Sequence, residues 1–194
     1  ARAARSGVLI KGGVYLENAG TAQVVVFDKT GTLTRGRPSV TDIVTTGSRS
    51  EDELIALAAA VESRSSHPLA SAVLEHADHR DLPALQEAGA DAVTAFEETV
   101  GHGAAATVGG TPVMVGNRKL MQKGGAALAS GIEEHAQRLE ADGKTVMFVA
   151  TGVSEHDATL EVAGLIAVRD QPRPEAAATI AALKELGVRH VVML

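Results

Sequence analysis

The sequence predicts a mixed fold of the α/β and α+β classes, in which an α/β domain with a parallel sheet is interrupted by a long inserted domain. The apolar, β-branched run at residues 24–27 is typical of a buried parallel strand. The middle of the chain carries helix signals and then short β-like segments between glycine-containing turns. The C-terminal segment returns to a helix followed by an apolar strand. We therefore expect α/β parts at residues 1–39 and 164–194, with the inserted domain at 40–163.

Composition and charge exclude several classes of protein. The chain has 194 residues, no cysteine and a formal net charge of −6. Because phosphate backbones attract basic faces, we expect no nucleic-acid partner. The lack of cysteine excludes disulfides and thiolate metal sites, and the longest apolar run, residues 54–61, is too short to span a bilayer. The chain begins without methionine and ends in the apolar run 191–194, so we expect a piece of a longer protein.

Two helix starts open the inserted domain. Ser50 and Glu53 have the spacing of a capping box, which predicts a helix running through Val61. A second helix is expected to begin at His67, in or near the N-cap position, with Pro68 at the first helical position. Both helices therefore have a defined N-terminus in the sequence.

The rest of the inserted domain is β-like. Short alternating segments are separated by glycine-containing turns, which predicts an antiparallel meander. The expected strands are 92–97, 104–108 and 112–115, followed by a helix at about 132–141 and two strands at 145–150 and 160–168 around a polar turn at 154–157.

The last segment returns to the α/β pattern. Pro174 is expected at a helix start, with Glu175 in the first turn, where a negative charge favours the helix dipole. Leu186 completes an apolar face and Gly187 is a plausible C-cap. A strand is then expected at 190–194.

A loop with a reactive carboxylate follows the first strand at its carboxyl end, where open α/β sheets bind ligands. A carboxylate such as that of Asp28 can attack the γ-phosphoryl group of ATP and form an acyl phosphate, a reaction that needs Mg²⁺ and fixed donors. Lys29 can supply positive charge, and the amides and hydroxyl of a glycine-containing loop can cradle phosphate oxygens. The loop reads Asp28-Lys29-Thr30-Gly31-Thr32-Leu33-Thr34.

This loop, placed after an apolar strand, resembles the signature of P-type ATPases. The resemblance implies a HAD-like (Rossmann-type) phosphorylation domain in which Asp28 is phosphorylated, with Lys29, Thr30 and Thr32 beside it. It also implies that the Asp28 carboxylate and the Thr30 backbone carbonyl bind Mg²⁺. HAD-type phosphatases carry a second Asp two residues after the nucleophile as general acid/base. Here that position is Thr30, so we expect a long-lived phosphoenzyme and keep the phosphatase, or an Asp28 that only caps a turn, as alternatives.

The inserted domain resembles the nucleotide-binding domain of heavy-metal (P1B) P-type ATPases. Glu62 precedes His67 by five residues, Gly101 and Gly103 form a Gly-x-Gly, and Gly116 lies in a Val-Gly-Asn. Each alone is usually a helix residue, a helix start or a turn, but together, in this order, they indicate binding of ATP or ADP. Glu62 can accept from the adenine amino group, a neutral His67 can pack against adenine or donate to the nucleotide, and the glycines leave room for it.

The resemblance implies ATP-driven export of a transition-metal ion by a parent protein with actuator and membrane domains, of which this chain is a cytoplasmic segment. The Lys-Gly-Gly at residues 11–13 and the Val-Met-Leu at the end favour zinc, cadmium or cobalt over copper. The family's further Mg²⁺ ligand and phosphate contacts lie beyond Leu194, so we expect nucleotide binding with little turnover. The alternatives are a nucleotide-binding module without catalysis and a structural or protein-binding domain.

Overall fold

The computed structural model contains two compact units, which are described separately. One consists of residues 1–36 and 171–194, and the other of residues 37–170, whereas the sequence analysis put the boundaries at 39/40 and 163/164. Both divisions lie inside long strands, β2 (Thr34–Thr45) and β7 (Leu160–Pro172). A boundary inside a strand leaves no break in the pattern for sequence analysis to find. The structure describes Arg5 and residues 7–47, 49–65, 67–80, 82, 93–152 and 159–194.

The smaller unit is built on a parallel pair of strands, β1 (Val24–Phe27) and β8 (His190–Met193). The parallel strand at 24–27 is confirmed, but its expected burial is wrong, since Val24 and Val26 are each 53% exposed. In the two-stranded sheet that the described residues form, alternate side chains of β1 still face solvent. Helix α8 (Ala176–Glu185) begins two residues after Pro174, and α2 (Gly13–Gly20) was not predicted.

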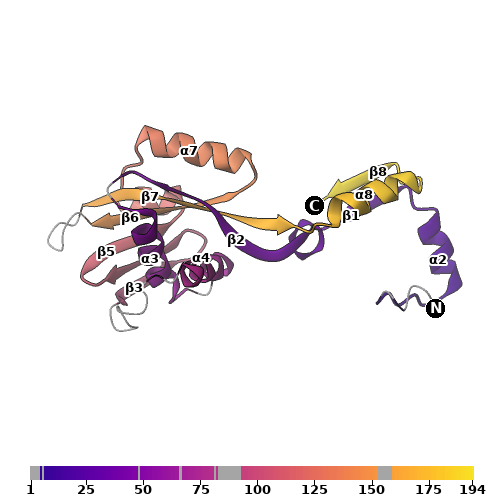
Figure 1. Ribbon diagram of the computed structural model, residues 1–194, viewed down its shortest axis with the longest axis horizontal. Coiled ribbons are helices and arrows are strands. Elements are labelled where there is room, and N and C mark those ends of the chain that lie inside the picture. Colours follow the sequence, from indigo (N-terminus) through magenta and orange to yellow (C-terminus); the bar gives the residue numbers. More distant parts are fainter. Residues whose placement is uncertain are drawn as a thin grey trace. The chain divides into compact units, whose positions relative to one another are not determined.

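The larger unit contains a six-stranded sheet with the order β2-β7-β6-β5-β4-β3 (Figure 1). Strands β3 to β7 pair with their neighbours in antiparallel fashion, which confirms the predicted meander. The turn expected at 154–157 lies outside the described residues. The strands not yet given are β3 (Val93–Thr99), β4 (Gly103–Val108), β5 (Thr111–Gly116) and β6 (Thr145–Gly152).

Helices cover both faces of this sheet, so its central strands are buried on two sides (Figure 1). One face is covered by α3 (Glu51–Glu62) and α4 (Pro68–His79), and the other by α6 (Arg118–Lys123) and α7 (Ser130–Ala141). Along β6, Met147 and Val149 belong to the core under α3 and α4, while Phe148 and Ala150 belong to the core under α6 and α7. This alternation follows from the period of two in a strand.

The predicted helix starts are confirmed. The Ser50 hydroxyl accepts the Glu53 N–H at 3.2 Å, and the Glu53 carboxylate accepts the Ser50 N–H at 2.8 Å, which is a complete capping box. His67 caps α4 and Pro68 is its first residue. Across the described part of the chain, helices are too short or too polar to cross a membrane.

Candidate functional site

Asp28 directly follows β1, at the carboxyl edge of the parallel pair. The end of this strand is tied to the end of β8, since the Leu194 N–H donates to the Phe27 carbonyl at 2.9 Å and the Lys29 N–H donates to the Leu194 carbonyl at 3.2 Å. Asp28 has an extended backbone and an exposed side chain. The carboxylate is therefore open to a ligand at the edge where α/β sheets bind one.

The Asp28 loop, residues 28–34, is held from within by a buried hydroxyl. Thr34 is only 8% exposed. Its Oγ1 donates to the Lys29 carbonyl at 2.9 Å and accepts the Gly31 N–H at 3.1 Å. Gly31 adopts φ of +78°, a conformation that favours glycine. The loop is thus closed by its own last residue, a role that sequence analysis did not assign.

A distant arginine holds the other side of the Asp28 loop. Arg173 donates from Nε to the Thr32 carbonyl and from a terminal nitrogen to the Gly31 carbonyl, each at 3.1 Å. Its backbone N–H also donates to the Leu33 carbonyl at 2.9 Å. Thr32 and Arg173 are 141 positions apart in the chain. No local pattern predicts a contact of that separation, which is why sequence analysis missed it.

The loop offers oxygen atoms of the kind that Mg²⁺ prefers. The hydrogen bonds described above engage the carbonyls of Lys29, Gly31, Thr32 and Leu33, and none of them uses Thr30. Thr30 has ψ of 121°, which turns its carbonyl away from the helical direction. The Asp28 carboxylate and this carbonyl are hard oxygen ligands, so the residues present fit Mg²⁺.

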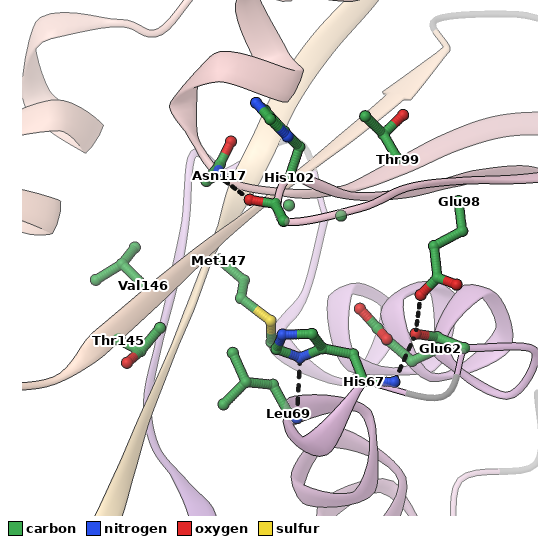
Figure 2. A pocket seen from close by; sticks show the side chains of 14 residues that line it. Glu62, His67, Leu69, Glu98, Thr99, His102, Asn117, Thr145, Val146 and Met147 are labelled. Carbon is green, nitrogen blue, oxygen red and sulfur yellow. Dashed lines mark hydrogen bonds between the residues drawn. The ribbon is translucent and has the colours of Figure 1, made fainter.

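The larger unit contains a cavity of about 220 Å³ that gathers all five residues predicted to bind nucleotide (Figure 2). They reach it from the α3–α4 connection, the β3–β4 turn and the end of β5, and the start of β6 completes the wall. Among the described residues that line this pocket there are two glutamates and two histidines but no lysine or arginine. The predicted residues are Glu62, His67, Gly101, Gly103 and Gly116.

Glu62 and His67 stand at the two ends of the α3–α4 connection. Glu62 is 5% exposed, and burial raises the pKa of its carboxyl; a hydrogen bond with Ser65 opposes this rise and the charge of Glu98 adds to it. The His67 Nδ1 accepts the Leu69 N–H at 3.2 Å. An accepting nitrogen carries no proton, so the ring in this geometry is the neutral tautomer with its proton on Nε2. The pocket thus holds a carboxyl and an N–H donor.

Two of the pocket glycines are required by the protein's own backbone. Gly103 and Gly116 are register partners in β4 and β5. A Cβ at Gly103 would lie 2.1 Å from the Val115 carbonyl oxygen, and one at Gly116 would lie 2.3 Å from the His102 carbonyl oxygen. Sequence analysis attributed Gly103 to nucleotide clearance, whereas here the close approach of two strands already requires it. Because glycine has no side chain, these two residues also occupy little of the pocket that they line.

The third glycine shapes the β3–β4 turn. Gly101 adopts φ of +73°, and a Cβ there would meet no atom within 4 Å. Its carbonyl accepts from the Asn117 side-chain amide at 3.0 Å, while the Asn117 Oδ1 accepts the Leu120 N–H at 3.2 Å and so caps α6. The His102 Nδ1 lies 2.9 Å from the Val100 carbonyl. Asn117 therefore joins this turn to the start of α6.

Comparison with known proteins shows that the chain resembles haloacid dehalogenase-like hydrolases and segments of metal-transporting P-type ATPases. It matches the family model described as haloacid dehalogenase-like hydrolase over residues 22–194. It is 40% identical over 191 residues to the copper-transporting P-type ATPase of Rhizobium leguminosarum bv. viciae, covering 98% of this chain and 21% of that protein. It is 37% identical over 194 residues to the cadmium-transporting ATPase of Staphylococcus aureus, covering 99% of this chain and 25% of that protein. The chain thus spans a quarter or less of the length of these relatives.

The chain also resembles solved structures of metal-transporting P-type ATPases. The crystal structure of a zinc-transporting PIB-type ATPase in the E2.Pi state is 38% identical, with a TM-score of 0.78, and the match covers 98% of this chain and 28% of that one. The N-domain of HMA6, a copper-transporting P-type ATPase, is 30% identical with a TM-score of 0.51 over 69% of this chain and 99% of that domain.

Proposed function

This chain belongs to the haloacid dehalogenase-like hydrolase family, and from that premise we propose that it is the ATP-binding and phosphorylation region of a heavy-metal-transporting P-type ATPase. The observation that carries the proposal is the convergence of Glu62, His67 and the three glycines on one pocket, in a chain that also presents Asp28 at a strand end. The likeness to copper-, cadmium- and zinc-transporting ATPases supports it.

The pocket suits the base and ribose of a nucleotide better than its phosphates. Its two glutamates repel phosphate, whereas the ionised Glu62 carboxylate can accept from an exocyclic amino group and the His67 Nε2–H can donate. The apolar side chains of Leu69 and Met147 supply packing surface for a purine. We infer that ATP or ADP binds with its base inside the pocket and its phosphates directed out of it.

Asp28 is the proposed phosphate acceptor. Its carboxylate oxygen forms a bond to the γ-phosphorus of ATP while the bond from phosphorus to the leaving ADP oxygen breaks, which gives an aspartyl phosphate. When bound, Mg²⁺ neutralises charge on the phosphates, and the Asp28 carboxylate and Thr30 carbonyl would hold it. Thr30, Lys29 and Thr32 then surround the new phosphate without a second carboxylate to activate water, so the phosphoenzyme is long-lived.

The transported ion and the setting are part of the same proposal. In it the chain is a cytoplasmic segment of an integral membrane protein, it works with actuator and membrane domains of that protein, and its phosphorylation drives export of a transition-metal ion. Residues 11–13 favour zinc, cadmium or cobalt over copper. Metal-stimulated ATPase activity of the full-length protein tests this; stimulation by Cu⁺ alone would reverse the preference.

Isothermal titration with ADP tests the nucleotide site. We expect the chain to bind ADP and His67→Ala to weaken binding about tenfold, because a hydrogen bond and a packing surface are lost together. His135→Ala is the matched control: this histidine is exposed on α7, is not among the residues that line the pocket, and bonds only to the Gly131 carbonyl among the contacts described. Equal affinities in the two variants would remove the proposed nucleotide site.

A second experiment tests the acceptor. Incubation of the full-length protein with γ-labelled ATP should give a hydroxylamine-sensitive label that is absent in Asp28→Asn. The chain by itself is expected to turn over little ATP. Sustained, metal-independent ATPase activity of the chain, lost in Asp28→Asn, would contradict that expectation.

A further inference from the structure

Glu98 lies at the edge of the pocket and takes no part in the nucleotide contacts proposed above. Its Oε1 accepts a hydrogen bond from the Ser65 hydroxyl at 2.9 Å, and the oxygen of that hydroxyl accepts the His67 backbone N–H at 3.2 Å (Figure 2). Two hydrogen bonds therefore join the end of β3 to the residue that caps α4.

A β-bulge turns Glu98 toward the helices. Between Thr94 and Glu97, β3 contains one residue more than its partner β4, and within this stretch Ala95 adopts φ of +50°. Beyond the bulge, Glu98 is paired with Ala104, which belongs to the core beneath α3 and α4. Directly opposite residues of antiparallel strands share a face. In an unbroken ladder the shift of one residue would turn Glu98 to the other face.

The segment that Glu98 reaches connects α3 to α4 and is held by backbone and side-chain hydrogen bonds. The described residues between the two helices, 63–65, and His67 lie in neither helix. The Ser65 N–H is bonded to the Glu62 carbonyl at 3.0 Å, and the Ser65 hydroxyl supplies the contact to the sheet. A carboxylate is a strong acceptor for such a hydroxyl.

We propose that Glu98 is a positioning residue of the nucleotide pocket: through the Ser65 hydroxyl it fixes the connection between α3 and α4 and holds the His67 imidazole in place. This inference rests on the proposed nucleotide binding. The Ser65 hydroxyl donates to Glu98 and its oxygen accepts the His67 N–H. One hydroxyl therefore links the end of β3 to the residue that caps α4.

The test is a double-mutant cycle on ADP affinity, measured by isothermal titration at pH 7.5. Glu98→Ala and Ser65→Ala should each weaken binding about fivefold, as expected for one hydrogen bond. If Glu98 acts through Ser65, the double variant is no weaker than either single variant. Glu98→Gln keeps an oxygen that can accept from the hydroxyl and should restore affinity to within about twofold of wild type.

Glu97→Ala is the matched control, since Glu97 is exposed and is paired with Ala105, which packs in the core on the other face of the sheet. Its affinity should equal that of wild type. Folding of every variant is checked by urea unfolding, so that affinities refer to folded protein.

Two results would overturn the positioning role while nucleotide binding stands: additive losses in the double variant, or a Glu98→Gln variant as weak as Glu98→Ala. A wild-type chain without ADP affinity would remove the nucleotide proposal, and the positioning role with it. Coupled losses with rescue by glutamine would support both.

Discussion

The two candidate sites of this chain are assembled in opposite ways. The Asp28 loop is one continuous run of residues, closed by the Thr34 hydroxyl and by Arg173. Its reactive side chain is exposed. The pocket instead draws on four separate stretches of chain, and Glu62 within it is only 5% exposed.

The difference indicates what each site depends on. The unit that contains the pocket also contains both core clusters, so its walls are strands and helices fixed by packing. In the other unit, α2, β1, α8 and β8 contain no fully buried residue. We therefore expect the pocket to respond to changes in backbone and core, and the Asp28 loop to respond mainly to loss of its own hydrogen bonds.

The largest expected effect separates two glycines of the pocket. Gly103→Ala places a Cβ 2.1 Å from a backbone oxygen, so the strands must move apart. We expect a loss of more than about 4 kcal/mol in the free energy of unfolding, and loss of ADP binding. Gly101→Ala meets only the strain of a positive φ, which costs about 1–2 kcal/mol. Urea unfolding measures both; equal losses would show that strand approach is not the constraint.

Thr34→Val tests whether the Asp28 loop depends on its own hydrogen bonds. It removes a buried hydroxyl that makes two hydrogen bonds within the Asp28 loop. We expect a local loss of about 1–3 kcal/mol, seen as faster exchange of the Gly31 amide hydrogen. ADP affinity should not change, because Thr34 is not among the residues that line the pocket. Thr34→Ser, which keeps the hydroxyl, is the control; an equal effect on Gly31 would contradict the assignment.

Glu62→Gln separates stability from binding within the pocket. Burial raises the pKa of Glu62 above its ordinary 4.5. Its protonated form therefore stabilises the fold below pH 4.5, and that contribution is lost as the pH rises through the raised pKa. The variant should be more stable than wild type at pH 8 but not at pH 4, and should bind ADP about tenfold more weakly, because a charged acceptor is lost. Urea unfolding at both pH values and ADP titration test this; a less stable variant at pH 8 would refute it.

Features that depend on neighbouring residues could be predicted from the sequence, whereas features that depend on distant contacts could not. The capping box at Ser50, the start of α4 at Pro68 and the meander depend on neighbouring residues, and the structure confirms them. Helix α6 has six residues, too few for a periodic pattern, and was missed. Burial of the strand at 24–27 was wrong because a sequence shows that a strand is apolar, not how much of it other elements cover.

At the pocket, the order of the motifs predicted five nucleotide-binding residues, and the structure brings all five to one cavity; their role in binding stays a prediction. Their supporting residues were not found, for a geometric reason. Ser65 and Glu98 are 33 positions apart, and which face Glu98 occupies depends on a bulge that adds one residue to β3. A pattern with period two places this side chain on the wrong face unless the bulge is known. Such contacts follow from register, which a single sequence does not determine.

The bulge itself gives the smallest and most specific prediction. Ala95 has φ of +50°, which glycine adopts without strain. Relief of that strain, about 1–2 kcal/mol, is opposed by the greater freedom of glycine in the unfolded chain, about 0.4–1 kcal/mol. We expect Ala95→Gly to stabilise the larger unit by about 0–1.6 kcal/mol and to leave ADP affinity unchanged. Ala105→Gly, on the facing strand and without a positive φ, should destabilise by about 0.5–1 kcal/mol. If both substitutions destabilise the protein equally in urea, Ala95 is not strained, and the bulge that turns Glu98 toward Ser65 must be held by something other than backbone conformation.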